Sequence, residues 1–516
     1  MLPRTKVSLG FMLAVIMVII SPPATAKDLN LTPPLPAVLD IGARAIISET
    51  DSQLTANYKE LILITGEPVL AAGTVEIRKG KPRNNQMNTT YSYDLENKQH
   101  GLKLNRRLTV VTTWEQRGKE LTAKNEVSRF TETVRTESRQ YKLDSKRSLL
   151  NFSTVTMAEP AVSYFAGNLE GCKVYTVGRN EGQVVVDITG DSTGYDQPWG
   201  QVEIQNSYGT IRSELVDAEG TVISWDGTFN SQVSHSTKVD LQYVANEPVQ
   251  ISFPGGYLQT ETSEGVIRVN YDLPRPDEEG VPLGSRRQQK QETINLTGTP
   301  KTQRLSVPQF SDIQGRWSEQ DAILLGSLGA WKGESKYFHP TASVDRREFA
   351  LAMAKALRLK PQEATTSRTN FSRRNQELPS SPYRDLSVED EDWPYLKVVT
   401  ESGIMQGIAP GYFGPQGKVT RAQAVTAFIR ALGFENLGPG TGYQTGFTDD
   451  GDIPSWARNN FAVGRQIGIV SGDGFGRARP GAYLTREEAA TMLARLVAYL
   501  RSDILRDYRD RILLYH

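Results

Sequence analysis

Between residues 54 and 273, apolar and polar residues alternate with a period of two. This period is typical of strands that bury one face, and the runs are separated by turns rich in Gly, Asp-Gly and Asn. The clearest runs are residues 60–65, 73–78, 108–114, 183–189, 201–205 and 266–271. Residues 115–148 keep the alternation with polar residues on both faces, which indicates long, partly exposed antiparallel strands. The pattern predicts an all-β region, either a sandwich or a long curved antiparallel sheet, in one or two domains.

From residue 308 the apolar residues follow helical spacing, and a unit of roughly 50 residues occurs three times. Each unit has an aromatic-x-Asp opening, a Trp-led apolar run, two glycines four residues apart, and a proline six residues before an arginine. Counted from that arginine, positions +3, +7 and +11 form an apolar stripe, as in Phe349, Met353 and Leu357. One copy could not bury its stripe alone, so we expect the three units to pack together. The opening aspartates, to which we assign a structural role, are Asp312, Asp385 and Asp449.

The second helix of each unit begins with a capping box, in which an N-cap side chain and the residue three positions later satisfy each other's backbone N–H groups. The predicted pairs are Asp345 with Glu348, Thr420 with Gln423, and Thr485 with Glu488.

An arginine occupies the first helical position of all three boxes: Arg346, Arg421 and Arg486. The helix dipole disfavours a cation there by about 0.3–1 kcal/mol. Because all three units repeat this unfavourable choice, we interpret the arginines, with the free N–H groups of the helix start, as anion sites. The alternative is that each arginine pairs with a neighbouring acid or lies along the surface.

At these residues the sequence resembles the S-layer homology domains, whose hallmarks are an aromatic-x-Asp opening and a Thr-Arg-Ala-Glu-like box. The resemblance covers about residues 308–500. It implies an all-α pseudo-threefold bundle that attaches non-covalently to secondary cell-wall polysaccharide, often pyruvylated, in grooves between repeats. Residues 419–423 (Val-Thr-Arg-Ala-Gln) come closest to the family box, so we expect Arg421 to bind most strongly. The first unit departs at Asp345 and Arg347, and the third has Ala478 where the others have Phe338 and Phe413.

Further candidates for contact with the wall glycan come from the same units. Trp317, Trp393 and Trp456 begin the first helices, where they are core residues or stack on sugars. In the loops, the candidates are Gly333, Gly407 and Gly472.

The remaining segments predict an exported protein. Residues 1–26 have a positive start, an apolar run at 11–20 and an Ala-Thr-Ala cleavage site, as in a secretory signal; the run is too short for a retained membrane anchor. We expect no membrane insertion after cleavage, and a location in the wall or S-layer of a Gram-positive bacterium.

The predicted divisions are a signal at 1–26, a proline-rich leader with a short helical pattern at 27–53, β domains at 54–273, a linker at 274–307, the first unit at 308–359, a polar insert at 360–382, the second unit at 383–436, a Gly-rich linker at 437–446, the third unit at 447–500 and a helical tail at 501–516.

Composition and motifs add little chemistry. The 59 basic residues balance 59 acidic ones, so the net charge gives no reason to expect binding to nucleic acid. Cys172 is the single cysteine, and the pattern favours a buried small side chain over a reactive thiol. Residues 190–194 match Gly-x-Ser-x-Gly but lack the helix that a nucleophile elbow needs. Residues 449–452 are interpreted as a turn and not as a calcium loop.

We therefore predict no catalytic residues, no metal and no cofactor, and the oligomeric state stays open. Three hypotheses remain for the whole chain. In the first, it is a wall-anchored protein with a structural or adhesive β module. In the second, it is a wall-anchored glycan-active enzyme, and in the third, a subunit of an S-layer lattice.

Overall fold

The computed structural model describes residues 53–216, 219–244, 256–276, 282–297, 300–331, 336–359, 381–439 and 442–503. The expected signal peptide, the leader and nearly all of the polar insert and the helical tail lie outside these residues. Among the described residues, no helix is long and apolar enough to cross a bilayer.

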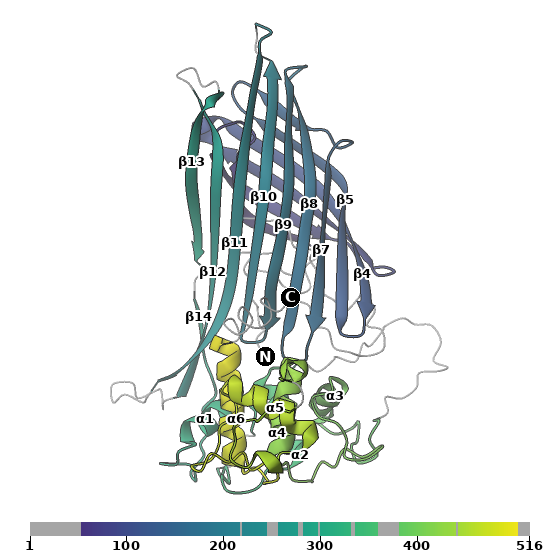
Figure 1. The fold of residues 1–516 in the computed structure, drawn as a ribbon, viewed down its shortest axis with the longest axis vertical. Helices are drawn as coiled ribbons and strands as arrows, with labels where there is room; N and C mark the ends of the chain where they lie inside the picture. The colour runs from purple at the N-terminus through teal and green to yellow at the C-terminus, as the bar shows by residue number, and fades with distance from the viewer. Residues whose placement is uncertain are drawn as a thin grey trace.

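The N-terminal part is one antiparallel sheet of 14 strands (Figure 1). Nearly all strands are neighbours in sequence order, so the sheet is built from successive hairpins. The strands are β1 (Gln53–Ile62), β2 (Val69–Lys79), β3 (Gln86–Asn97), β4 (Leu102–Arg117), β5 (Glu120–Arg135), β6 (Gln140–Leu143), β7 (Leu149–Ala158), β8 (Ser163–Val177), β9 (Gly182–Gln197), β10 (Gly200–Val216), β11 (Val222–Val244), β12 (Gly256–Pro276), β13 (Pro282–Thr297) and β14 (Lys301–Arg304).

The alternation of the sequence becomes one buried and one exposed face. On β4, Leu104 and Leu108 are fully buried, whereas Asn105 and Arg107 between them are exposed. A single core cluster runs from Tyr58 on β1 to residues of β12, so the sheet curves around its own apolar face (Figure 1). The curved sheet, one of the two expected architectures, is the one observed. Residues 190–194 lie inside β9 and not at a strand–helix turn.

The linker expected at residues 274–307 is wrong for the part described there. β12 continues to Pro276, and β13 and β14 both pair with β12. The segment has few apolar residues, which is why its composition looked like a linker. An edge strand is held mainly by backbone hydrogen bonds to one neighbour, so its side chains can stay polar.

The C-terminal part consists of helices, two to each unit. They are α1 (Glu319–Ser327) and α2 (Arg346–Ala356), α3 (Trp393–Glu401) and α4 (Arg421–Leu432), and α5 (Ser455–Gln466) and α6 (Arg486–Ala498), followed by η5 (Tyr499–Asp503). All three predicted capping boxes are formed. The residues of the expected apolar stripes are buried, as Phe349, Phe428 and Leu493 illustrate.

Three short segments before α2, α4 and α6 join the units in a closed cycle. The N–H of Val344 donates to the carbonyl of Leu484, that of Leu484 to Val419, and that of Val419 to Val344. Each segment therefore gives one backbone hydrogen bond and receives one, which makes the three units mutually dependent.

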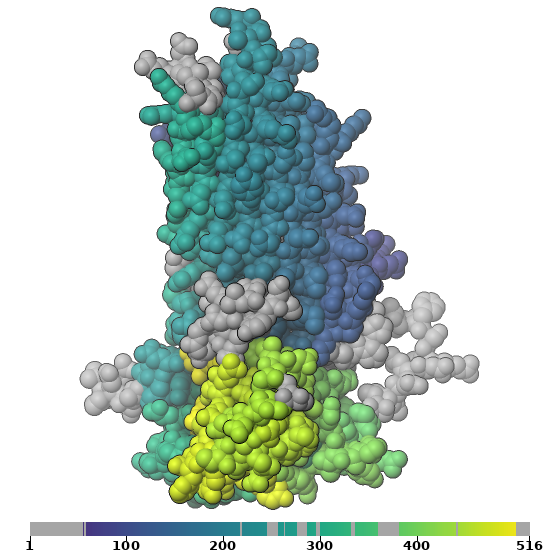
Figure 2. All heavy atoms as spheres, in the orientation of Figure 1, coloured from purple at the N-terminus to yellow at the C-terminus, as the bar shows by residue number. Residues whose placement is uncertain are grey.

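The helical part packs directly against one end of the sheet (Figures 1 and 2). Trp199, in the turn between β9 and β10, is fully buried, and its indole N–H donates to the carbonyl of Ala356 at 3.2 Å. The Arg358 guanidinium lies 3.8 Å from the centre of a Trp199 ring. Tyr195 and Val239 of the sheet belong to the same core cluster as the helices. The two parts thus share a core.

Candidate functional site

The aspartate of each aromatic-x-Asp opening binds the backbone of the loop between the two helices of its own unit. The Asp385 carboxylate accepts the backbone N–H groups of Phe413 and Gly414 at 2.8 and 2.7 Å. Asp312 and Asp449 accept two backbone N–H groups in the same way. Burial opposes the charge of Asp312, but these two N–H groups outweigh it and lower the pKa of the carboxyl. The three aspartates are therefore loop clamps.

Arg346 reaches from the first unit into the second. Its side chain donates to the carbonyls of Phe413 at 3.0 Å and Gln406 at 2.6 Å. The guanidinium lies 4.9 Å from the centre of the Phe413 ring, and the residue is only 5% exposed. Burial lowers the pKa of Arg346.

Arg421 and Arg486 repeat this arrangement around the cycle. Arg421 donates to the carbonyls of Ala478 and Ser471 in the third unit, at 2.8 and 3.3 Å. Arg486 donates to the Glu348 carboxylate at 2.7 Å and lies over the Phe338 ring of the first unit. Each of the three side chains thus ties its unit to the next one.

The N–H groups at the helix starts already donate to carbonyls, so the expectation that they are free to bind an anion is wrong. The N–H of Arg421 donates to Ala482 and that of Ala422 to Pro480, both carbonyls of the next unit. The same two bonds recur at the starts of α2 and α6, and the capping boxes take the N–H of the third helical position. An anion can therefore be held by arginine side chains but not by these amides.

Arg421 has surroundings that the other two arginines lack. Ala478 offers no ring to cover its guanidinium, where the other units have a phenylalanine. Burial lowers the pKa of Arg421, and Arg479 and Arg495 act in the same direction, while Glu488, 3.8 Å away, opposes them. Arg479 and Arg495 are exposed, and Arg495 donates to the Ser471 hydroxyl at 2.8 Å. We call Arg421, Ser471, Arg479 and Arg495 the Arg421 cluster.

The repeat pattern did not single out Arg479 or Arg495. Arg479 stands where the other units have His339 and Gly414, and Arg495 matches Lys355 and Arg430, cations in the last turn of a helix that the helix dipole alone explains. The signal that could have found them is local. Arg479 lies directly before the unit's proline, and Arg495 lies nine residues after Arg486 on the same helix.

The candidate tryptophans differ in exposure. Trp393 is 8% exposed and belongs to the core, whereas Trp317 and Trp456 are 64% and 55% exposed. The exposed pair lies before or at the start of its helix and presents a ring to solvent. Trp393 cannot stack on a sugar in this conformation.

The candidate glycines allow tight loops. A Cβ on Gly407 would lie 2.6 Å from the Tyr412 carbonyl oxygen, and one on Gly472 would lie 2.8 Å from the backbone of Gly476. Gly333 lies outside the described residues. At residues 449–452, Asp450 accepts hydrogen bonds from Thr445 and forms an ion pair with Arg458. No group of three His, Cys, Asp or Glu side chains in the described ranges is placed to hold a metal ion.

Comparison with known families identifies the second and third helical units. The family model described as "S-layer homology domain" matches residues 382–425 and 446–490, which are the larger parts of the second and third units.

Three curated relatives show the same likeness. An endoglucanase of Bacillus sp. (strain KSM-635) is 28% identical over 150 residues, 28% of this chain and 15% of the relative. The exoglucanase XynX of Acetivibrio thermocellus is 26% identical over 207 residues, 38% of this chain and 17% of the relative. A surface-layer 125 kDa protein of Lysinibacillus sphaericus is 23% identical over 194 residues, 36% of this chain and 14% of the relative. The chain spans less than a fifth of the length of these relatives.

The family match falls on the units whose aspartate clamps, capping boxes and cyclic hydrogen bonds are described above. Residues 382–425 and 446–490 of this chain are S-layer homology domains.

Proposed function

We propose that the helical part anchors this protein at the bacterial cell surface by binding an anionic secondary cell-wall polysaccharide, with the Arg421 cluster as the main site. The three units act as a pseudo-threefold bundle, and the sheet is a structural or adhesive module carried by that anchor. The S-layer homology matches support the cell-surface location.

The observation that carries the proposal is the gathering of three guanidinium groups at the boundary of the second and third units. Arg479 and Arg495 are exposed, and the Arg421 side chain, on which both act electrostatically, is 12% exposed. Planar guanidinium groups bind carboxylates with two parallel hydrogen bonds, so this cluster suits an acidic sugar.

The other two boundaries suit an anion less well. Arg486 is neutralised by Glu348 at 2.7 Å, and Arg346 is buried under the Phe413 ring. We therefore rank the boundary of the second and third units first. Trp317 and Trp456 are the two tryptophans whose rings are free to stack on sugars, and a pyruvylated glycan is the ligand that we would try first.

The test uses the exposed members of the cluster, because Arg421 also holds the fold together. Full-length parent and the double variant R479Q/R495Q are co-sedimented with purified bacterial cell walls. We expect at least a tenfold weaker association for the variant.

A matched control is K397Q/R430Q, which removes the same charge elsewhere on the helical part. Arg430 lies in the last turn of α4, at the opposite end of that helix from Arg421. If both variants bind as tightly as the parent, the Arg421 cluster is not the site. If both weaken equally, the association is non-specific.

A further inference from the structure

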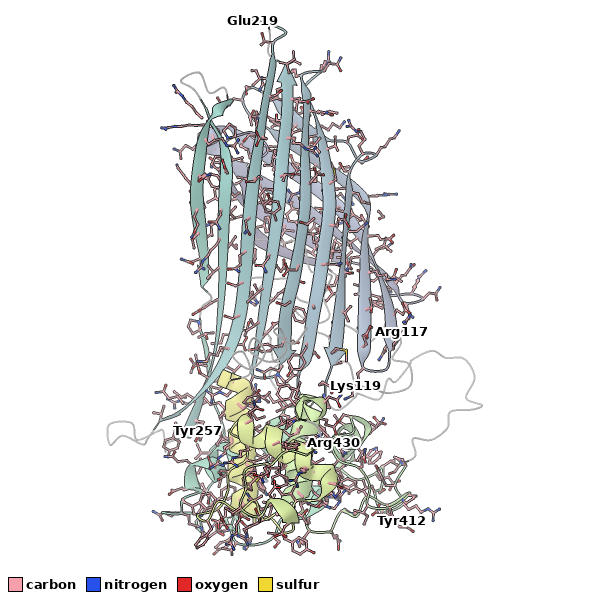
Figure 3. The ribbon with its side chains drawn as sticks, in the orientation of Figure 1. Arg117, Lys119, Glu219, Tyr257, Tyr412 and Arg430 are labelled. Atoms are coloured by element: carbon pink, nitrogen blue, oxygen red, sulfur yellow. The ribbon has the colours of Figure 1, made fainter. Side chains whose placement is uncertain are left out.

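The sheet has a hollow at the end that points away from the helices. Arg117 and Lys119, in the turn between β4 and β5, lie near the helical part, so Arg135 at the other end of β5 lies far from it (Figure 3). There the turn of residues 136–139 and the turn of residues 178–181 border a hollow of about 510 Å³. We call it the distal hollow; its lining includes Arg135, Arg139, Gln140, Lys142, Thr176 and Arg179.

Strand pairing places its polar side chains in two neighbouring rows on one face of the sheet. Arg135 on β5 is the register partner of Gln140 on β6, and Lys142 on β6 is the partner of Thr176 on β8. All four side chains are exposed on the outer face of the sheet. They therefore line a surface that spans three strands, which is more rigid than a single loop.

The cations of this surface have no carboxylate partner within the described part of the chain. Arg135, Lys142 and Arg179 form no ion pair there, whereas other exposed cations of the sheet do. Arg78 pairs with Glu76, for instance, and Arg212 with Asp187.

The two acids that border the hollow lie against turn glycines. A Cβ on Gly101 would come within 2.4 Å of Glu137 Cγ, so the Glu137 side chain leans over the turn between β3 and β4. A Cβ on Gly178 would come within 2.1 Å of the Glu181 carboxyl group, which therefore lies on its own turn. Four cations against two acids leave the lining positive.

We propose that the distal hollow binds a segment of a polymer that carries phosphate or carboxylate groups. Its volume is within the range of small-ligand sites, roughly 300–1,000 Å³. Arg135 and Lys142, on adjacent strands, contact successive oxyanions, and the Ser138 hydroxyl donates to a sugar or phosphate oxygen. The chain then has an anion site at each end, and the distal site does not depend on the wall anchor proposed above.

The test is calorimetric titration of the full-length protein at low salt with two probes, tripolyphosphate and trigalacturonate. They share the oxyanion chemistry and separate a phosphate source from a carboxylate source. We expect at least one probe to bind the parent and the Kd to rise at least tenfold in R135Q/K142Q. The Kd should also rise with ionic strength.

The matched control is K98Q/K103Q, which removes two cations at the same end of the sheet but outside the hollow; in the parent these pair with Glu96 and Asp94. Its Kd should stay within twofold of the parent. All titrations are repeated in the R479Q/R495Q background, which removes the exposed arginines of the Arg421 cluster, so that the tenfold effect of R135Q/K142Q reports on the distal hollow alone. The proposal is overturned if neither probe binds, if R135Q/K142Q binds like the parent, or if K98Q/K103Q weakens binding equally.

Discussion

Glu203 is an acid buried in the sheet, and it forms no ion pair with a cation in the described part of the chain. Burial raises its pKa to about 7, although the Gln205 amide, which donates to it, acts in the opposite direction. Its register partner on β11 is His235, whose pKa burial lowers to about 4, so the histidine is neutral near pH 7. The folded chain holds the Glu203 proton more tightly than the unfolded chain does. Stability therefore falls as pH rises from about 4.5 through about 7.

We predict that Glu203→Gln stabilises the protein at pH 8 by up to about 3 kcal/mol, because the variant never buries a charge. At pH 4 the difference should nearly vanish, since Glu203 is then protonated in both states. Denaturant unfolding at the two pH values measures this. An equal difference at both would mean that the effect is packing and not ionisation.

Glu132 shows the opposite behaviour. Burial alone would raise its pKa, but attraction to Arg106 and Lys173 outweighs it and holds the value at about 2. Arg106 also donates to Glu60, and Tyr175 donates to Glu132, so the cluster is buried and internally paired. Its contribution to stability is present above about pH 4.5 and is lost as pH falls toward 2.

We predict that Glu132→Gln lowers the free energy of unfolding by about 3–5 kcal/mol at pH 7, because a buried cation of the cluster then lacks its carboxylate partner. The control Arg212→Gln breaks an exposed pair with Asp187 and should cost at most about 1 kcal/mol. Denaturant unfolding at pH 7 compares them. Similar losses in the two variants would contradict the role given to the buried cluster.

At the scale of elements, the aspartate clamps order the loops on which the neighbouring arginines rest. Asp385→Asn keeps one acceptor oxygen for two N–H groups, and each bond to the charged form contributes about 1.5–3 kcal/mol. We predict faster amide hydrogen exchange across residues 406–417, measured by mass spectrometry, in the variant. Asp452→Asn, at an exposed turn, should leave this segment unchanged. Unchanged exchange in Asp385→Asn would show that the carboxylate does not hold the loop.

Sequence periodicity was sufficient for most of the elements. The period of two predicted the strands, including the polar ones of residues 115–148, and the capping boxes predicted where α2, α4 and α6 begin. It failed at β13, because a polar edge strand has no buried face to produce a pattern. The arginines stood out for their unfavourable position, but their contacts with the next unit are long-range and could not be read from one chain segment. Trp199 gave no signal of its role, since its partners Ala356 and Arg358 lie more than 150 residues away in sequence.

At the scale of the molecule, the sheet and the helical part share a core. Trp199→Ala removes the side chain that is fully buried between them and should cost about 3–5 kcal/mol. We predict that calorimetric unfolding, a single transition in the parent, separates into two in the variant. Tyr208→Ala, on the exposed face of β10, is the control and should keep one transition. Two transitions already present in the parent would show that the parts unfold independently.

The proposed function requires that the helical units hold this protein to an anionic wall polysaccharide. The most direct measurement is co-sedimentation of the full-length chain with purified bacterial cell walls, before and after chemical removal of the polysaccharide. We predict binding to intact walls that is lost on stripped walls and recovered when the released polysaccharide is coupled to an inert support. Equal binding to intact and stripped walls would contradict the claim and point to another wall component.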